Sequence, residues 1–187
     1  MNAKSDLNLA ASELCQTLQN IDEQELSAFI DILKDHPRIF VYGAGRSLLM
    51  MKAFAMRLMH LGYEAYVVGE VTTPAFLKHD CLVIASASGE TKSLLMIAEN
   101  AKAIQGQILA LTIFEGSSLA KLADGIIRVP AYTDKRPPSE TNRPSLLTGS
   151  SMFEEAVLLL GDTIILELAK HKQLDLTKAF DKHANLE

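Results

Sequence analysis

The sequence predicts an α/β fold, a three-layer α/β/α sandwich with a five-stranded parallel sheet in the strand order 2-1-3-4-5. Short apolar runs, typical of buried strands, alternate with segments of helical periodicity between residues 38 and 130. This spacing favours parallel βαβ units over hairpins. The chain of 187 residues also has the length of one domain and shows no internal repeat.

The composition is that of a globular protein, with 48% hydrophobic and 22% charged residues and a net charge of −5. Because this charge is negative, we expect no nucleic-acid partner and no attraction to an anionic membrane. No apolar stretch has the length of a membrane span, and the first ten residues lack the pattern of a signal peptide. The two cysteines, Cys15 and Cys81, lie far apart, which favours reduced thiols and a cytoplasmic location.

We expect a single domain over residues 1–187. Its segments are the N-terminal helices over 1–36, the sheet core over 37–130, the active-site loop over 131–150, and the C-terminal helix and tail over 151–187. The loop segment lacks periodicity and carries three prolines and three basic residues (Pro137, Pro138, Pro144, Lys135, Arg136 and Arg143). A loop of this length inside a compact domain is usually functional or mobile.

The elements follow one another along the chain. The N-terminal segment has a break near residues 20–22, where Asp22 can cap a second helix, and Pro37 ends that helix. Strands are expected over 38–42, 64–68, 81–85, 107–113 and 125–129, and helices over 48–61, 93–104, 117–122 and from 150 or 151 to 171. The helices over 48–61 and 150–171 present more apolar surface than one sheet face needs, so we expect a homo-oligomer.

A cluster of hydroxyl groups lies where the third strand turns into a helix, in Ser86-Ala87-Ser88-Gly89-Glu90-Thr91. The first N–H groups of a helix have no intrahelical partner, and the helix dipole is positive there. Hydroxyls, a glycine and free N–H groups suit a phosphate. Taken alone, the turn is explained equally well as a helix N-cap with spare serines.

A second turn, Gly43-Ala44-Gly45-Arg46-Ser47, follows the first strand. In a doubly wound sheet, ligands bind beyond the carboxyl ends of the strands where the strand order reverses, and the two turns flank that point. Glycines 43 and 45 allow close approach of a ligand, and Ser47 adds a hydroxyl. A dinucleotide fingerprint is disfavoured because position 48 is leucine instead of a third glycine, and no P-loop sequence occurs.

Five stretches together resemble a known family. They are GAGRS (43–47), AFAMRLMHLG (53–62), VVGEVTTP (67–74), SASGET (86–91) and the terminal HANLE (183–187). The chain resembles the 6-phospho-3-hexuloisomerases, small members of the sugar isomerase (SIS) superfamily, over residues 38–187. The resemblance implies an SIS-type fold, a homotetramer, no cofactor and no metal. It also suggests a role in formaldehyde assimilation by the ribulose monophosphate pathway, with the physiological direction left open.

The resemblance implies interconversion of D-arabino-hex-3-ulose 6-phosphate and D-fructose 6-phosphate through a 2,3-cis-enediol. A base must take the C2 proton, and other groups must move a proton between the two oxygens or stabilise their charge. The resemblance places the base at Glu154 and suggests that His183 in the tail assists. The implied phosphate and substrate site comprises Gly45, Arg46, Ser47, Ser86, Ser88 and Thr91.

Several points stay open. From the residues alone, Glu154 is explained equally simply by the helix dipole, and Glu155 is indistinguishable from it as a base. Whether His183 and His60 act within one chain or across a subunit interface is undecided. The segment 147–154 lacks a Pro-Met pair that is usual in the family, which leaves the exact sugar preference open. The alternatives are an isomerase of another sugar phosphate, such as arabinose 5-phosphate, and a non-catalytic sugar-phosphate sensor.

Overall fold

Five parallel strands form the central sheet. The computed structural model describes residues 2–175 and 183–186. Its strands lie in the order β2-β1-β3-β4-β5, and each neighbouring pair is parallel. They are β1 (Arg38–Gly43), β2 (Glu64–Val67), β3 (Cys81–Ala85), β4 (Gln107–Thr112) and β5 (Gly125–Arg128). The predicted α/β fold and its strand order are thereby confirmed.

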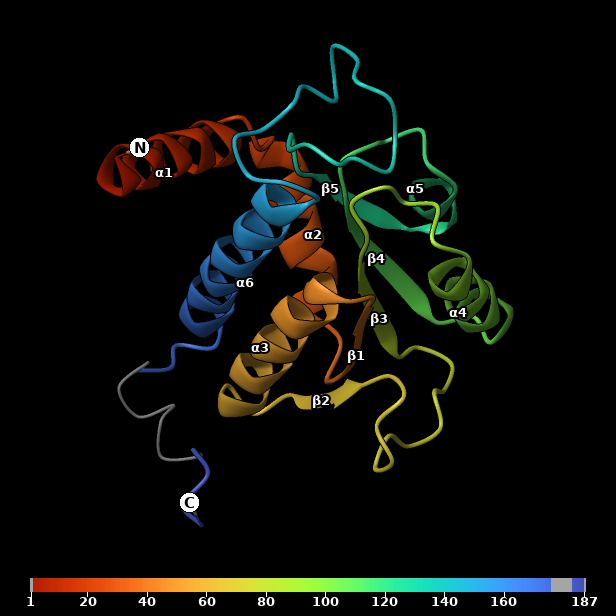
Figure 1. Cartoon of the computed structure of the whole chain (residues 1–187). Helices are drawn as coiled ribbons and strands as arrows, with labels where there is room; N and C mark the ends of the chain where they lie inside the picture. The colour runs from red at the N-terminus through yellow and green to blue at the C-terminus, as the bar shows by residue number, and fades with distance from the viewer. Residues whose placement is uncertain (1, 176–182, 187) are drawn as a thin grey trace.

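Helices cover both faces of this sheet and complete the three layers (Figure 1). On one face lie α2 (Glu23–Lys34), α3 (Arg46–His60) and α6 (Ser151–His171). The other face is covered by α4 (Lys92–Ala103) and the short α5 (Ser118–Leu122). The first helix, α1 (Ala3–Gln19), packs against α6, and its N-terminal end projects from the body of the molecule.

The two core layers follow from the alternation of side chains along each strand. In β3, residues 81, 83 and 85 face the layer of α3 and α6, whereas residues 82 and 84 face the layer of α4 and α5. All five are buried, as expected for a central strand of a parallel sheet. Since the strands are in register, with Gly43 opposite Ala85, the turns that follow β1 and β3 leave the same edge.

The helix that follows β1 begins two residues earlier than the sequence predicts, at Arg46 instead of residue 48. The reason is Gly45, whose φ of 59° lies in a region that favours glycine and turns the chain sharply. The sharp turn places Arg46 and Ser47 in the first turn of α3 instead of in a loop. In α2, by contrast, Asp22 caps the helix as predicted, accepting bonds from the N–H groups of residues 24 and 25 at 2.8 and 3.0 Å.

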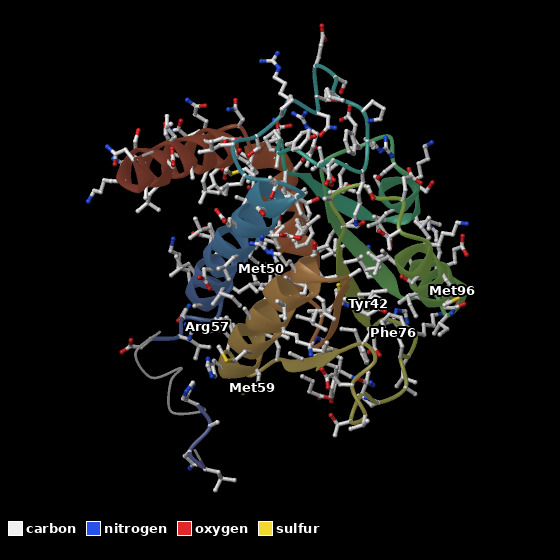
Figure 2. The ribbon with its side chains drawn as sticks, viewed as in Figure 1. Tyr42, Met50, Arg57, Met59, Phe76 and Met96 are labelled. Atoms are coloured by element: carbon white, nitrogen blue, oxygen red, sulfur yellow. The ribbon has the colours of Figure 1, made fainter. Side chains whose placement is uncertain are left out.

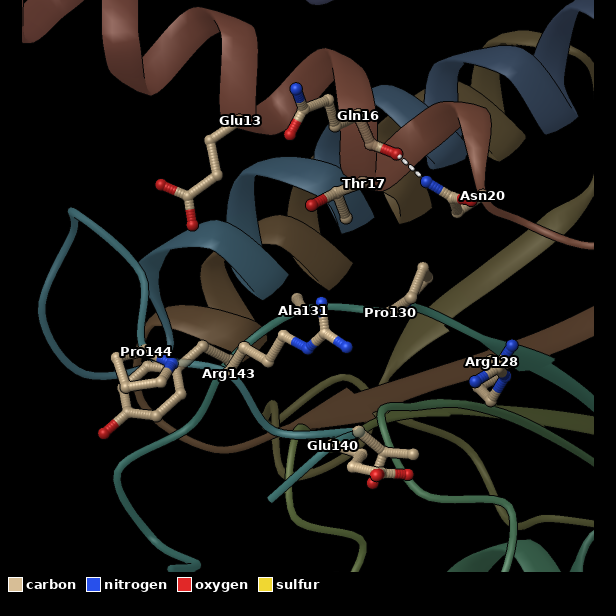
Figure 3. A pocket seen from close by; sticks show the side chains of 12 residues that line it. Glu13, Gln16, Thr17, Asn20, Arg128, Pro130, Ala131, Glu140, Arg143 and Pro144 are labelled. Atoms are coloured by element: carbon tan, nitrogen blue, oxygen red, sulfur yellow. Dashed lines mark hydrogen bonds between the residues drawn. The ribbon is translucent and has the colours of Figure 1, made fainter. Parts of the chain in front are cut away.

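The segment over 131–150 forms no helix and no strand of the sheet, and it arches over the end of the sheet from β5 to α6 (Figure 1). Between its outer side and α1 lies an open cavity of about 430 Å³. Glu13, Glu140, Arg128 and Arg143 contribute charged side chains to it (Figure 3). The charges are of both signs, and the cavity lies outside the two hydroxyl-bearing turns.

Apolar side chains remain exposed on α3 and α6. They are Leu49, Met56 and Met59 on α3 and Leu158, Leu159 and Leu166 on α6. Figure 2 shows Arg57 and Met59 toward the C-terminal end of α3, at the opposite end from the turn after β1. Among the described residues, no helix combines the length and the hydrophobicity needed to cross a bilayer. Part of the tail expected after α6 lies outside the described residues.

Candidate active site

The turn over 86–91 is a compact hydrogen-bonded unit at the end of β3. The hydroxyl of Ser86 accepts a bond from the N–H of Gly89 at 3.2 Å, and the hydroxyl of Ser88 accepts one from the N–H of Glu90 at 3.3 Å. A serine hydroxyl that accepts such a bond keeps its own proton to donate. Thr91, the residue before α4, makes no capping bond with its side chain. The turn thus presents hydroxyl donors at the positive end of a helix dipole.

Gly89 is required in this turn for two physical reasons. Its φ of 65° lies in the left-handed region. A Cβ atom at this position would also lie 2.2 Å from the hydroxyl oxygen of Ser117 and 2.4 Å from the Cβ of Ser117. The turn therefore packs directly on the residue that caps α5, and no side chain fits between them.

The turn after β1 provides the second half of the phosphate site expected from the sequence. A Cβ on Gly43 would lie 2.9 Å from the backbone nitrogen of Leu48, so the start of α3 packs closely against the end of β1. Ser47 is buried in the first turn of α3. Because Gly43 and Ala85 are paired in register, Gly45, Arg46 and Ser47 lie in a turn adjacent to the one that carries Ser86, Ser88 and Thr91.

Glu154 lies in the first turn of α6, with 8% of its surface exposed. Its Oε2 forms an ion pair with Nε of Arg46 at 3.0 Å. The same guanidinium donates a hydrogen bond of 2.6 Å to the hydroxyl of Ser151, which in turn donates to the carbonyl oxygen of Thr148 at 2.9 Å. Arg46 thus connects the first turns of α3 and α6 and holds the carboxylate of Glu154 beside the turn after β1, which leaves the same sheet edge as the turn over 86–91.

Burial raises the pKa of Glu154 above its ordinary value, and the nearby Glu155 acts in the same direction. The charges of Arg46 and Lys135 oppose this rise. A carboxylate with a raised pKa is a stronger base than an ordinary surface glutamate, and it is still ionised once the pH exceeds that pKa. Lys135 belongs to the loop over 131–150, and the sequence offered no signal for its proximity to Glu154.

The structure separates the two candidate bases. Glu154 faces Arg46, whereas Glu155 lines a different cavity, between α1 and the loop residues 146 and 147. Their difference follows from helix geometry, since adjacent residues on a helix point about 100° apart. Only Glu154 of the two has an ion-pair contact with the turn after β1 among the described residues.

The carboxylate of Glu90 is bound by groups outside its own turn. Its Oε1 accepts bonds from the N–H of Ser118 at 3.0 Å and from Nη2 of Arg136 at 2.8 Å. The bonds from Ser118, followed by the charge of Arg136, lower the pKa of Glu90. The turn therefore contains a carboxylate whose charge is balanced by Arg136. Sequence patterns gave no indication of the contact with Arg136, which lies in a segment without periodicity.

His183 is placed elsewhere in the same chain. Its Nδ1 lies 3.3 Å from Nε2 of His60, with the ring centroids 5.3 Å apart. His60 is the last residue of α3, and Arg46 is the first, so about 20 Å of helix separates this histidine pair from the site. Burial, then the charges of Arg57 and His183, lower the pKa of His60. Within one chain, the structure does not bring His183 to Glu154, and its catalytic role stays a prediction.

Comparison with known proteins supports the class that the fold and the two turns define. A profile described as the SIS domain matches residues 32–151. The 3-hexulose-6-phosphate isomerase of Bacillus subtilis (strain 168) is 43% identical over 176 residues, which cover 94% of each chain. The protein of the same name from Mycobacterium gastri is 33% identical over 183 residues, covering 98% of this chain and 90% of the relative.

A solved structure agrees with this relationship. The hypothetical protein from Methanococcus jannaschii, whose structure is described as inferring a function of 3-hexulose-6-phosphate isomerase, superposes with a TM-score of 0.79. It is 34% identical to this chain, and the match covers 98% of this chain and 99% of the other. The fold and the site define a protein of the SIS-domain class. Within that class, the chain belongs to the 3-hexulose-6-phosphate isomerase family, which confirms the resemblance noted in the sequence.

Proposed function

We propose that this chain interconverts D-arabino-hex-3-ulose 6-phosphate and D-fructose 6-phosphate through a 2,3-cis-enediol. The observation that supports this most directly is the buried Glu154, held by Arg46 at the turn after β1, which leaves the same edge of the sheet as the turn over 86–91. Relatives that carry the name of this isomerase match nearly the whole chain. The geometry and the family relationship therefore support the same reaction.

In this proposal the phosphate of the sugar binds to the turn over 86–91. Ser86, Ser88 and Thr91 donate hydroxyl protons, and the dipole of α4 adds a favourable potential. Ser47 and the backbone at Gly45 contribute from the neighbouring turn. The net charge of the protein is negative, so these local donors have to hold the dianion.

Glu154 then acts as the base. It takes the proton from C2, the electron pair of the C2–H bond forms the C2–C3 double bond, and negative charge develops on the oxygen at C3. The hydroxyl proton moves from the oxygen at C2 to the oxygen at C3, and Glu154 returns its proton to C3. The carbonyl now lies at C2, and each step is a proton transfer within the sugar and its site.

Arg46 has two roles in this sequence of steps. In the free protein its guanidinium keeps Glu154 oriented and counteracts the rise in pKa that burial causes. Once the proton is on Glu154, the ion pair is lost and the positive charge of Arg46 is available to an oxygen of the enediolate. Such a preorganised charge stabilises a developing anion without rearrangement of solvent.

We further propose that the single domain assembles into a homotetramer in the cytoplasm and that His183 assists catalysis in a neighbouring subunit. Exposed leucines and methionines on α3 and α6 provide apolar surface for subunit contacts. His183 lies against His60 at the end of α3, away from its own Glu154. A proton-shuttling role for His183 therefore requires the site of another copy.

The test is a substrate comparison with the purified full chain. Formation of fructose 6-phosphate from the 3-hexulose 6-phosphate is coupled to glucose-6-phosphate isomerase and glucose-6-phosphate dehydrogenase and followed as NADPH. Arabinose 5-phosphate is offered in parallel, with ribulose 5-phosphate as the measured product. We expect turnover of the hexulose phosphate and little of the pentose phosphate. Thermal stabilisation by sugar phosphates without turnover of either would instead support a sensor.

A further inference from the structure

The loop over 133–142 is organised around the side chain of Asn142, which is fully buried at 0% exposure. Its Oδ1 accepts a bond from the N–H of Thr133 at 2.9 Å. Its Nδ2 donates to the carbonyl oxygens of Thr133, Arg136 and Pro137 at 2.9, 3.0 and 3.1 Å. Two backbone bonds of 3.2 Å between Ser139 and Asn142 close the same segment. These contacts make residues 133–142 one unit, which we call the Asn142 unit.

The base of the Asn142 unit is attached to the helix that carries Glu154. The hydroxyl of Thr133 lies 2.9 Å from the hydroxyl of Ser150, the residue that precedes α6. Thr133 also accepts a bond from the N–H of Lys135 at 3.3 Å. The same hydroxyl therefore connects the start of α6 with the part of the loop that carries Lys135, whose charge acts on Glu154.

The other side of the Asn142 unit contacts the turn over residues 86–91, called the phosphate turn below, through Arg136. Nη2 of Arg136 donates to Oε1 of Glu90 at 2.8 Å and to the carbonyl oxygen of Ser88 at 3.2 Å. Its guanidinium carbon lies 4.2 Å from the centroid of the Phe114 ring. Bonds between charged groups are the stronger kind, and a guanidinium over an aromatic face adds a cation–π attraction. Arg136 thus contacts Glu90, Ser88 and Phe114 at once.

We infer that Arg136 is a positioning residue, which docks the Asn142 unit on the phosphate turn and thereby sets the position of the phosphate relative to Glu154. One end of the unit is bonded to the start of α6, and the other is bonded to Ser88 and Glu90. The bond to Ser88 is to its carbonyl oxygen, which leaves the serine hydroxyl for the ligand. Arg136 acts through the turn and not as a ligand of the sugar.

The position of the phosphate matters because proton transfer depends on distance. A substrate anchored at one end by its phosphate presents C2 to Glu154 only if turn and base keep a fixed separation, and small displacements lower the rate strongly. Loss of the contact between Arg136 and Glu90 should therefore lower kcat more than it raises KM. A phosphate ligand would show the opposite pattern, a raised KM with little change in kcat.

A kinetic test rests on the proposed function and uses Arg136→Ala, Glu90→Ala, the double variant and Arg136→Lys. Each single alanine variant is expected to lower kcat by about tenfold or more, and the double variant to lose little beyond either one, because both remove the same contact. Arg136→Lys should recover part of kcat, since a lysine can still reach the carboxylate. Arg143→Ala, in the same loop but directed to the cavity of Figure 3, serves as the matched control and should keep the wild-type kcat.

A second readout needs no enzyme activity. Trypsin needs an extended stretch of chain in its cleft, so we expect cleavage after Lys135 to require local opening of the loop, whereas the Arg136–Pro137 and Arg143–Pro144 bonds resist it. In native protein, Arg136→Ala and Glu90→Ala should accelerate this cleavage by about tenfold, because a local opening equilibrium shifts. Arg143→Ala should leave the rate of this cleavage unchanged. The thermal midpoint of each variant shows that the fold is retained.

The outcomes are distinguishable. If the wild type is inactive but Arg136→Ala and Glu90→Ala still accelerate cleavage after Lys135, the proposed isomerase function is refuted. The inferred docking of Arg136 on Glu90 is then still supported. Unchanged cleavage in both variants overturns the inference. It is also overturned if Arg136→Ala raises KM alone and Glu90→Ala has no effect, which would make Arg136 a ligand of the substrate.

Discussion

Arg46 and Glu154 form an ion pair, with Nε of the arginine 3.0 Å from Oε2 of the glutamate. The two residues are far apart in sequence, because Arg46 begins the helix after β1 and Glu154 lies in the helix after β5. The pair joins the turn after β1 to the helix that follows the long loop. Burial raises the pKa of Glu154 and the arginine opposes that rise. The pKa of Glu154 therefore depends on both burial and Arg46.

Replacement of the proposed base should remove activity. Glu154→Gln keeps the shape of the side chain but cannot accept the C2 proton, and we expect kcat to fall by about 10²–10⁴-fold. Glu155→Gln is the matched control, because Glu155 lines another cavity, and it should retain nearly the wild-type rate. Both are measured in the coupled fructose 6-phosphate assay. A Glu154→Gln enzyme with near-normal turnover would falsify the assignment.

Removal of Arg46 should shift the pH profile. Glu154 acts as a base only when ionised, so kcat/KM rises with pH through its pKa. Arg46→Ala removes the group that lowers this pKa most, so the pKa rises further and the ascending acidic limb moves to higher pH. Lys135→Ala should move it in the same direction by a smaller amount. The assignment is contradicted if the limb in Arg46→Ala stays in place or moves to lower pH.

Gly89→Ala should destabilise the phosphate turn. The φ of 65° disfavours a side chain, and an added Cβ would overlap the hydroxyl oxygen of Ser117. We expect a loss of about 1–3 kcal/mol in the free energy of unfolding, together with weaker binding of inorganic phosphate. Gly116→Ala is the control, since a Cβ there meets nothing within 4 Å. Urea unfolding with and without phosphate measures both effects, and equal stability of the two variants would contradict the prediction.

His60 should make the stability of the fold depend on pH. Because burial lowers the pKa of His60 in the folded protein, the unfolded chain binds a proton more readily than the folded one. The contribution of His60 is therefore present above its ordinary pKa of about 6.5 and is lost as the pH falls below that value. Urea midpoints at pH 7.5 and 5.5 should differ less for His60→Gln than for the wild type. The same difference in both proteins would exclude His60 as the cause.

A shared active site can be tested by mixing subunits. Glu154→Gln lacks the base and His183→Ala lacks the proposed assisting group, so each homo-oligomer should be impaired. If His183 acts in a neighbouring subunit, hybrids formed by mild dissociation and reassociation contain sites with both groups intact, and activity should partly return. Mixtures that stay at the mean of the two separate variants would place His183 outside the neighbour's site.

Much of the fold was predictable because its signals are local. Apolar runs such as residues 81–85 indicate strands, and glycines with hydroxyl residues mark the turns after β1 and β3. Strand ends agree within a residue or two, the alternation of strands and helices indicates a parallel sheet, and the observed strand order is the predicted one. The start of α3 was missed because no sequence pattern indicates the positive φ of Gly45, which turns the chain into the helix at Arg46.

The candidate site was predictable only in part. The two hydroxyl turns were expected side by side, because parallel strands end at one edge of the sheet. The choice between Glu154 and Glu155 depends on the rotation of α6 about its axis, which the apolar composition of that helix does not specify. The docking of Arg136 on Glu90 joins an aperiodic loop to a distant turn, and no local pattern encodes such a contact.

Local sequence patterns were thus sufficient for the α/β architecture, the family and the two turns suited to phosphate, because backbone preferences and hydrophobic periodicity act over a few residues. The tertiary structure was needed to pair Arg46 with Glu154, to join Arg136 to the phosphate turn and to place His183 beside His60. These contacts depend on how helices and loops far apart in the chain pack around the sheet. Their geometry is a property of the whole fold.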